Sequence, residues 1–117
     1  MQKFKNSNYQ GNYGLGKCIA HYTQNEYIVS IPLNDTQDYD LIVERNGLLQ
    51  KIQVKTASTD RVHLRSGNYH GPKKKFSNEN LDVLFVVDTN GHLYTVPIKN
   101  FSNSSSISVN LLKEYRV

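Results

Sequence analysis

Asp40, Gln53 and Lys55 are a carboxylate, an amide and an amine that one β-hairpin would bring together. Their stretch, DYDLIVERNGLLQKIQVK, has apolar runs on both sides of Asn46-Gly47, the residue pair that a tight type I′ turn prefers. Counting outward from a two-residue turn places Asp40 across from Gln53, and Lys55 leaves the return strand on the same face as Gln53. A symmetric four-residue loop keeps this register, whereas a bulge or a three-residue loop would break it. We therefore expect the three groups to converge at the open end of the hairpin.

These groups suit metal-assisted hydrolysis of a phosphodiester bond. Asp40 would be the charged oxygen ligand of a hard cation such as Mg²⁺, with the Gln53 amide oxygen and the Val54 backbone carbonyl as neutral ligands. Lys55 would lie beside the bound water and the scissile phosphate, where it can orient the nucleophile or stabilise charge that develops on oxygen. The predicted catalytic residues are thus Asp40, Gln53 and Lys55, and the predicted metal ligands are Asp40, Gln53 and Val54.

The alternative is an ordinary solvated strand face with an Asp–Lys contact, since charged residues alternate on many exposed strands. Two features favour the chemical interpretation. The turn register fixes which residues share a face, and Leu41, Ile52 and Val54 give the opposite face an apolar core.

A helix is expected immediately before the first strand. Between residues 13 and 25 the apolar residues recur at helical spacing, as Leu15, Cys18, Ile19 and Tyr22. Gly14 and Gly16 are poor helix formers that make sense if this part of the helix lies close against another backbone. The polar residues 1–12 are expected to form a flexible N-terminal arm.

The remaining apolar runs predict further strands. The run EYIVSI at 26–31 predicts a strand, and this strand could be a central one in the sheet. LDVLFVV at 81–87 predicts a strand that is buried on both faces, and one helical turn is expected just before it at 78–81. The run 92–98 returns as its partner, and Pro97 predicts an edge position. The order predicts a mixed α/β domain over 13–101 with a helix on a sheet. Residues 102–117 are left as a C-terminal tail, which could fold on this chain or serve in oligomerisation.

The segment from Arg61 to Phe76 is the most basic part of the chain. Here basic residues alternate with aromatic rings, and no acidic residue occurs. Such a mixture can hold a phosphate backbone and stack on a base, and a solvated loop is the alternative. The predicted DNA-binding residues are Arg61, Arg65, Tyr69, Lys73, Lys74 and Lys75.

The bulk composition limits the class of protein. The chain has 117 residues and a net charge of +4, with a pI of about 9.2, so one domain with an anionic partner fits. Cys18 is the only cysteine, which excludes an intrachain disulfide and a cysteine-based zinc site. The N-terminus has no apolar core of a signal peptide, and no apolar run is long enough for a membrane helix. We expect a cytoplasmic protein that does not associate with membranes.

The runs SIPLNDTQDYDLIV and KIQVKTAS, with the helix GLGKCIAHYT and the strand LDVLFVV, resemble the PD-(D/E)xK nuclease superfamily over roughly residues 13–99. Within it they are most similar to the small endonucleases associated with group I introns, and close to archaeal-type Holliday junction resolvases. The resemblance implies a restriction-endonuclease-like mixed sheet flanked by helices, with an αβββαβ-type core. It also implies that Asp40 is a metal ligand and Lys55 the catalytic lysine, in an intracellular protein of phage or bacterial type.

This chain departs from the superfamily pattern at two positions. Lys17 stands at the expected position of a glutamate on the first helix, and Gln53 replaces the usual acidic residue, as occurs in this branch. Both changes reduce the negative charge available to a cation and favour one ion per subunit.

The resemblance leads us to expect a Mg²⁺-dependent endonuclease, with Mn²⁺ as a substitute ion, that cleaves duplex or branched DNA. Each subunit has one site, so cutting both strands requires a homodimer or a homotetramer. Three alternatives remain open: a Holliday junction resolvase that reads junction shape, a degenerate domain that binds DNA without cutting it, and a plain protein-interaction domain.

Overall fold

The computed structural model describes residues 4–34, 36–66, 74–75, 80–101 and 105–117, and at 65, 66, 74 and 75 it describes the backbone alone. The longer elements are α1 (Ser7–Gln24), β2 (Leu41–Arg45), β3 (Leu48–Thr56), β7 (Val83–Val87) and β8 (Leu93–Pro97). The short elements are β1 (Ile28–Ser30), β4 (Arg61–His63), β5 (Arg65–Ser66), β6 (Lys74–Lys75), β9 (Ser106–Ser108) and the 3₁₀ helices η1 (Ile98–Asn100) and η2 (Val109–Tyr115).

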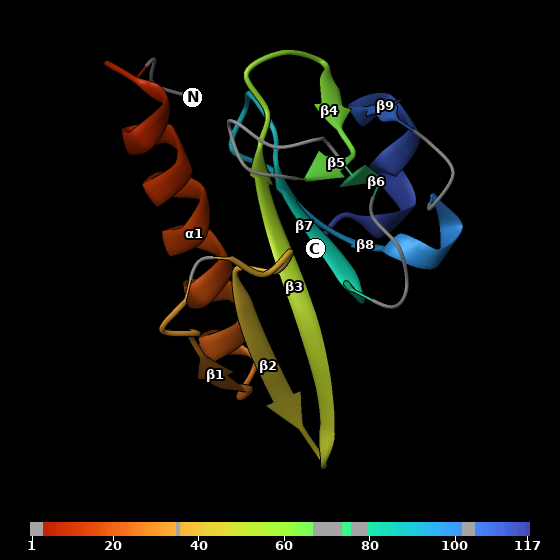
Figure 1. Cartoon of the computed structure of the whole chain (residues 1–117). Helices are drawn as coiled ribbons and strands as arrows, with labels where there is room; N and C mark the ends of the chain where they lie inside the picture. Colours follow the sequence, from red (N-terminus) through yellow and green to blue (C-terminus); the bar gives the residue numbers. More distant parts are fainter. Residues whose placement is uncertain (1–3, 35, 67–73, 76–79, 102–104) are drawn as a thin grey trace.

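Five strands form one mixed sheet in the order β1-β2-β3-β7-β8. β3 and β7 pair in parallel, whereas the other neighbours are antiparallel. Figure 1 shows α1 on one face of this sheet, while β4, β9 and η2 lie on the other side. The predicted mixed α/β architecture is therefore confirmed.

The hairpin of β2 and β3 has the predicted register. Arg45 pairs with Leu48, and the pairing continues to Leu41 with Ile52. The turn residues Asn46 and Gly47 have φ angles of 54° and 81°, the positive values that a type I′ turn requires at both central positions. The register that carries the functional prediction thus follows from this turn.

The first helix begins earlier than predicted. Asn6 caps it, because its side-chain oxygen accepts hydrogen bonds from the backbone N–H groups of Asn8 and Tyr9 at 2.9 and 3.2 Å. The prediction of a flexible arm before residue 13 is therefore wrong from Ser7 onward. Residues 7–12 are polar because this part of α1 does not cover the apolar core.

Two apolar clusters stabilise the two faces of the sheet. One lies under α1, where Cys18 and Tyr22 pack on Ile52 and Phe85. The other includes Leu112 of the C-terminal segment. The backbone N–H of Val117 donates to Leu93 O at 3.0 Å. The C-terminal segment, whose place the sequence left open, thus packs on β8 of this same chain.

The remaining strand predictions have mixed outcomes. β7 is buried throughout, as predicted, and it lies between β3 and its predicted partner β8. β8, which contains Pro97, is an edge strand, as predicted. β1 is also an edge strand and is half exposed, so the central position considered for it is wrong. The helical turn predicted at 78–81 falls mostly outside the described residues. No helix in the described part of the chain is long and apolar enough to cross a membrane.

Candidate active site

Asp40 lies at the open end of the hairpin, one residue before β2. Its backbone N–H donates to Ile52 O at 2.7 Å, which continues the ladder of hydrogen bonds beyond the strand. Its carboxylate oxygen Oδ2 accepts the backbone N–H of Val54 at 2.7 Å. The side chain is therefore bound across the hairpin to the strand that carries the other two predicted catalytic residues.

The three predicted catalytic residues line one cavity of about 440 Å³. From the hairpin come Asp40, Gln53, Val54, Lys55 and Thr56. The first two turns of α1 and one residue beyond them supply the opposite wall, with Ser7, Gln10, Gly11, Asn12 and Leu15. The polar start of α1 is therefore a wall of the candidate site, which explains why these residues are not apolar.

The electrostatics of the cavity centre on Asp40. Burial raises the pKa of its carboxyl group above the ordinary value, and the Val54 N–H and the nearby Lys55 ammonium only partly oppose this shift. Burial, together with the neighbouring charge of Asp40, also raises the pKa of the Cys18 thiol to about 12, so the thiol near Asp40 is neutral. A cation bound at Asp40 would relieve the cost of keeping that carboxylate ionised.

The helix is held tightly against the end of β3. Gln10 Nε2 donates to the carbonyl oxygen of Thr56 at 2.8 Å, next to Lys55 in the chain. Gly14 lies so close to Thr56 Oγ1 that no side chain would fit there without movement. The close approach expected from the sequence is thus present at Gly14, but it is made to the side chains of Thr56 and Val54 and not to another backbone. The expectation is wrong at Gly16, where a side chain would meet nothing within 4 Å.

Lys17, which stands where the family glutamate is expected, does not line the cavity. It is exposed, and its ammonium lies 5.7 Å from the centre of the Tyr13 ring. The helical residues that do reach the cavity include Gln10 and Asn12, which sequence reasoning missed. Their polar character within an otherwise amphipathic helix was the available signal.

The donor set of the cavity fits a hard cation. Carboxylate, amide and backbone carbonyl oxygens are the ligands that Mg²⁺ prefers, and Asp40, Gln53 and Val54, which carry one of each, are all among the lining residues. In the described residues no group of three His, Cys, Asp or Glu side chains could hold a metal ion. The described part of the chain would therefore bind a cation through one charged ligand, with neutral oxygens completing the set.

Four of the six predicted DNA-binding residues lie on the short strands after β3. Arg61 is exposed on β4, and its Nη2 donates to Ser106 Oγ at 2.9 Å. The backbones of β5 and β6 pair Arg65 with Lys75 and Ser66 with Lys74. Tyr69 and Lys73 lie outside the described residues.

Two larger cavities lie elsewhere. One of about 740 Å³ is formed at the end of α1 by residues such as His21, Tyr27 and Arg45, and one of about 520 Å³ lies beside the β7–β8 turn. Neither contains any of the predicted catalytic residues, so the chemistry of its lining, not its size, singles out the candidate site.

A family model described as PD-(D/E)XK endonuclease matches residues 5–116. The chain belongs to this endonuclease family. Among solved structures it is similar to a bacterial homing endonuclease, I-Ssp6803I, with a TM-score of 0.72 and 21% sequence identity over 86% of this chain and 76% of that chain. At this identity the likeness establishes the fold. A comparison with curated proteins gives no significant match. The predicted family and fold are therefore both confirmed.

Proposed function

We propose that this chain is a metal-dependent endonuclease that hydrolyses phosphodiester bonds of duplex or branched DNA. The observation that carries the proposal is the shared cavity of Asp40, Gln53 and Lys55 in a chain of the PD-(D/E)XK endonuclease family. The structural similarity to a bacterial homing endonuclease supports the same reaction class.

The proposed cofactor is Mg²⁺, for which Mn²⁺ can substitute. When bound, the ion polarises the phosphate and lowers the pKa of a bound water, which supplies a nucleophile near neutral pH. Asp40 is suited to hold it, because the hydrogen bond from the Val54 N–H to Oδ2 fixes its carboxylate in the cavity. Gln53 and the Val54 carbonyl add neutral oxygens, so the charges of Asp40 and Lys55 leave the cavity lining close to neutral before the ion binds.

Lys55 is the proposed catalytic lysine. Its ammonium is close enough to Asp40 to lower the pKa of that carboxyl group, so it lies within the electrostatic reach of the proposed metal site. There it orients the attacking water and stabilises the charge that develops on the phosphate oxygens. Gln10 holds the carbonyl of the next residue, Thr56, so α1 helps to fix where Lys55 lies.

A single chain offers one such site, so cleavage of both DNA strands requires two chains. We propose a homodimer or a homotetramer, in which Arg61 and the paired strands of Arg65, Lys74 and Lys75 contact the DNA backbone.

The decisive experiment incubates the purified protein with linear, supercoiled and four-way-junction DNA, in Mg²⁺ and in EDTA. The proposal predicts cleavage of at least one form in Mg²⁺ and none in EDTA. Cleavage confined to the junction would identify a resolvase. Intact DNA binding with no cleavage of any form in Mg²⁺ or Mn²⁺ would refute the proposal and favour a non-catalytic DNA-binding domain.

A further inference from the structure

A second polar cavity lies on the other side of the end of β3. It has a volume of about 520 Å³, and three separate parts of the chain form it. Thr59 and Asp60 come from the loop after β3, His92 comes from the β7–β8 turn, and Lys113 and Arg116 come from the C-terminal segment. None of these residues belongs to the candidate active site.

This cavity opens at the same end of the sheet as the candidate active site. β3 and β7 run in parallel, with Lys55 opposite Val86 and Thr56 opposite Val87. The turn that follows Val87 must therefore lie beside the end of β3, and Ala57 N donates to Val87 O at 2.8 Å. Figure 1 shows the end of β3 and the loop that follows β7 at the same end of the molecule.

Along the chain, two residues that line the cavity also come between the candidate active site and the predicted DNA-binding segment. Lys55 belongs to the first site, Thr59 and Asp60 line the cavity, and Arg61 begins the basic segment.

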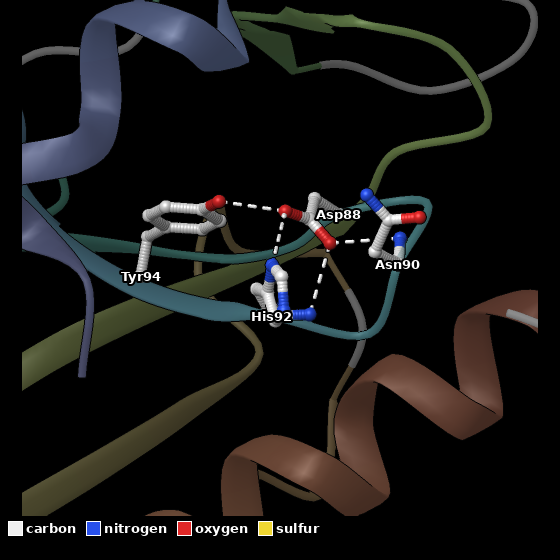
Figure 2. Close-up of polar contacts among 4 residues, drawn as sticks. All are labelled: Asp88, Asn90, His92 and Tyr94. Carbon is white, nitrogen blue, oxygen red and sulfur yellow. Dashed lines mark hydrogen bonds and ion pairs between the residues drawn. The ribbon is translucent and has the colours of Figure 1, made fainter.

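One wall of the cavity is fixed by the buried carboxylate of Asp88, which is only 6% exposed. Oδ1 accepts the backbone N–H groups of Asn90 and His92, both at 2.9 Å, and Oδ2 accepts the Tyr94 hydroxyl at 2.6 Å. His92 Nδ1 lies 3.5 Å from Oδ2 (Figure 2). Although burial raises the pKa of Asp88, these hydrogen bonds and His92 lower it below the ordinary value overall. The ionised carboxylate therefore holds the turn and the His92 ring in place.

The chemistry of the lining suits a phosphate. The ammonium of Lys113 and the guanidinium of Arg116 are exposed donors, and both residues line the cavity together with His92. The charge of Asp88 is already engaged by three hydrogen-bond donors. Asp60 is the second acidic residue of the lining, and its exposed carboxylate would repel a phosphate.

We propose that this cavity binds a backbone phosphate of the DNA strand that enters the candidate active site. Lys113 and Arg116 supply the positive charge, and the Asp88 turn positions His92 beside it. This inference rests on the proposed endonuclease function and adds a contact outside the predicted basic segment.

The test measures binding of a short fluorescent duplex in EDTA as a function of salt concentration. We expect the variant Lys113→Gln/Arg116→Gln to bind about tenfold more weakly and to lose about one unit of salt slope, because one phosphate is no longer neutralised. Asp60→Asn should bind about threefold more tightly. Both changes are at exposed side chains, so circular dichroism should show unaltered folding.

The matched control is Lys99→Gln. Lys99 is also exposed, but it lies in η1. This helix follows β8, at the opposite end of that strand from the β7–β8 turn. The single variants Lys113→Gln and Arg116→Gln should each weaken binding more than Lys99→Gln does. Wild-type affinity and slope in the double variant, or equal losses in all three single variants, would overturn the inference. The proposed function fails separately, through absence of Mg²⁺-dependent cleavage by the wild-type protein, which leaves these binding measurements unchanged.

Discussion

Replacing Gly14 by alanine tests the contact that positions the candidate active site. A methyl group at this position would collide with Thr56 Oγ1 and would lie 3.2 Å from Thr56 Cβ and 3.4 Å from Val54 Cγ1. Thr56 is the residue after Lys55, and both line the site. The helix must therefore move away from β3 at the place where Gln10 binds the Thr56 carbonyl.

Two opposing effects set the size of the change. Overpacking a close contact costs about 1–3 kcal/mol, whereas alanine is favoured over glycine inside a helix by about 1 kcal/mol. Gly16 supplies the matched control, because it lies in the same helix and an added methyl group meets nothing within 4 Å. Gly16→Ala should thus stabilise the protein by about 1 kcal/mol, and Gly14→Ala should be less stable than Gly16→Ala by about 1–3 kcal/mol.

Urea denaturation followed by circular dichroism measures both variants. The helix shift should also lower the cleavage rate of Gly14→Ala but not that of Gly16→Ala. Adding Thr56→Ala should restore the stability of Gly14→Ala, because it removes the colliding atom. Thr56 Oγ1 is buried without a hydrogen-bond partner, so the loss of this atom alone costs little stability. Equal stabilisation by the two glycine replacements would refute the close packing of α1 on the site.

Three further predictions concern single side chains. Lys55→Ala should abolish Mg²⁺-dependent cleavage in a gel assay while DNA affinity stays unchanged. The control Lys99→Ala should cleave normally. Normal cleavage by Lys55→Ala would exclude a catalytic role for Lys55. Burial raises the pKa of Asp40 in the folded protein above the ordinary pKa of 3.8. Ionisation of Asp40 therefore destabilises the metal-free protein as the pH rises from 3.8 through the folded-state pKa. Asp40→Asn should therefore gain about 0.5–2 kcal/mol in urea unfolding at pH 7 and lose cleavage, and a loss of stability would contradict this sign. Tyr94→Phe should cost about 1.5–3 kcal/mol at pH 7, and this cost should disappear as pH falls through the lowered pKa of Asp88; a cost independent of pH would show that the hydroxyl does not act through the carboxylate.

The part of the site that the sequence could predict is the part built by local structure. The pair Asn46-Gly47 fixes the turn, the turn fixes the pairing of β2 with β3, and the pairing places Asp40 beside Gln53. The continuous apolar run of β7 likewise predicts burial on both faces, because alternation is absent. These inferences needed no knowledge of how distant parts of the chain pack.

The parts that could not be predicted depend on contacts between distant segments. Ser7 and Gln10 look like a polar arm until β3 is known to end beside them. β1 has the β-branched residues of a central strand, but it contacts only β2 within the sheet. Arg116 joins the second cavity because its backbone pairs with Tyr94, a contact that tail composition does not indicate.

The most direct test of the central claim is an anomalous difference map from crystals of the DNA complex grown with Mn²⁺. The expected result is a peak about 2.0–2.2 Å from a carboxylate oxygen of Asp40 and close to the side-chain oxygen of Gln53, with Lys55 facing the scissile phosphate. A fully occupied Mn²⁺ ion at the cleaved bond that neither Asp40 nor Gln53 contacts would contradict the claim.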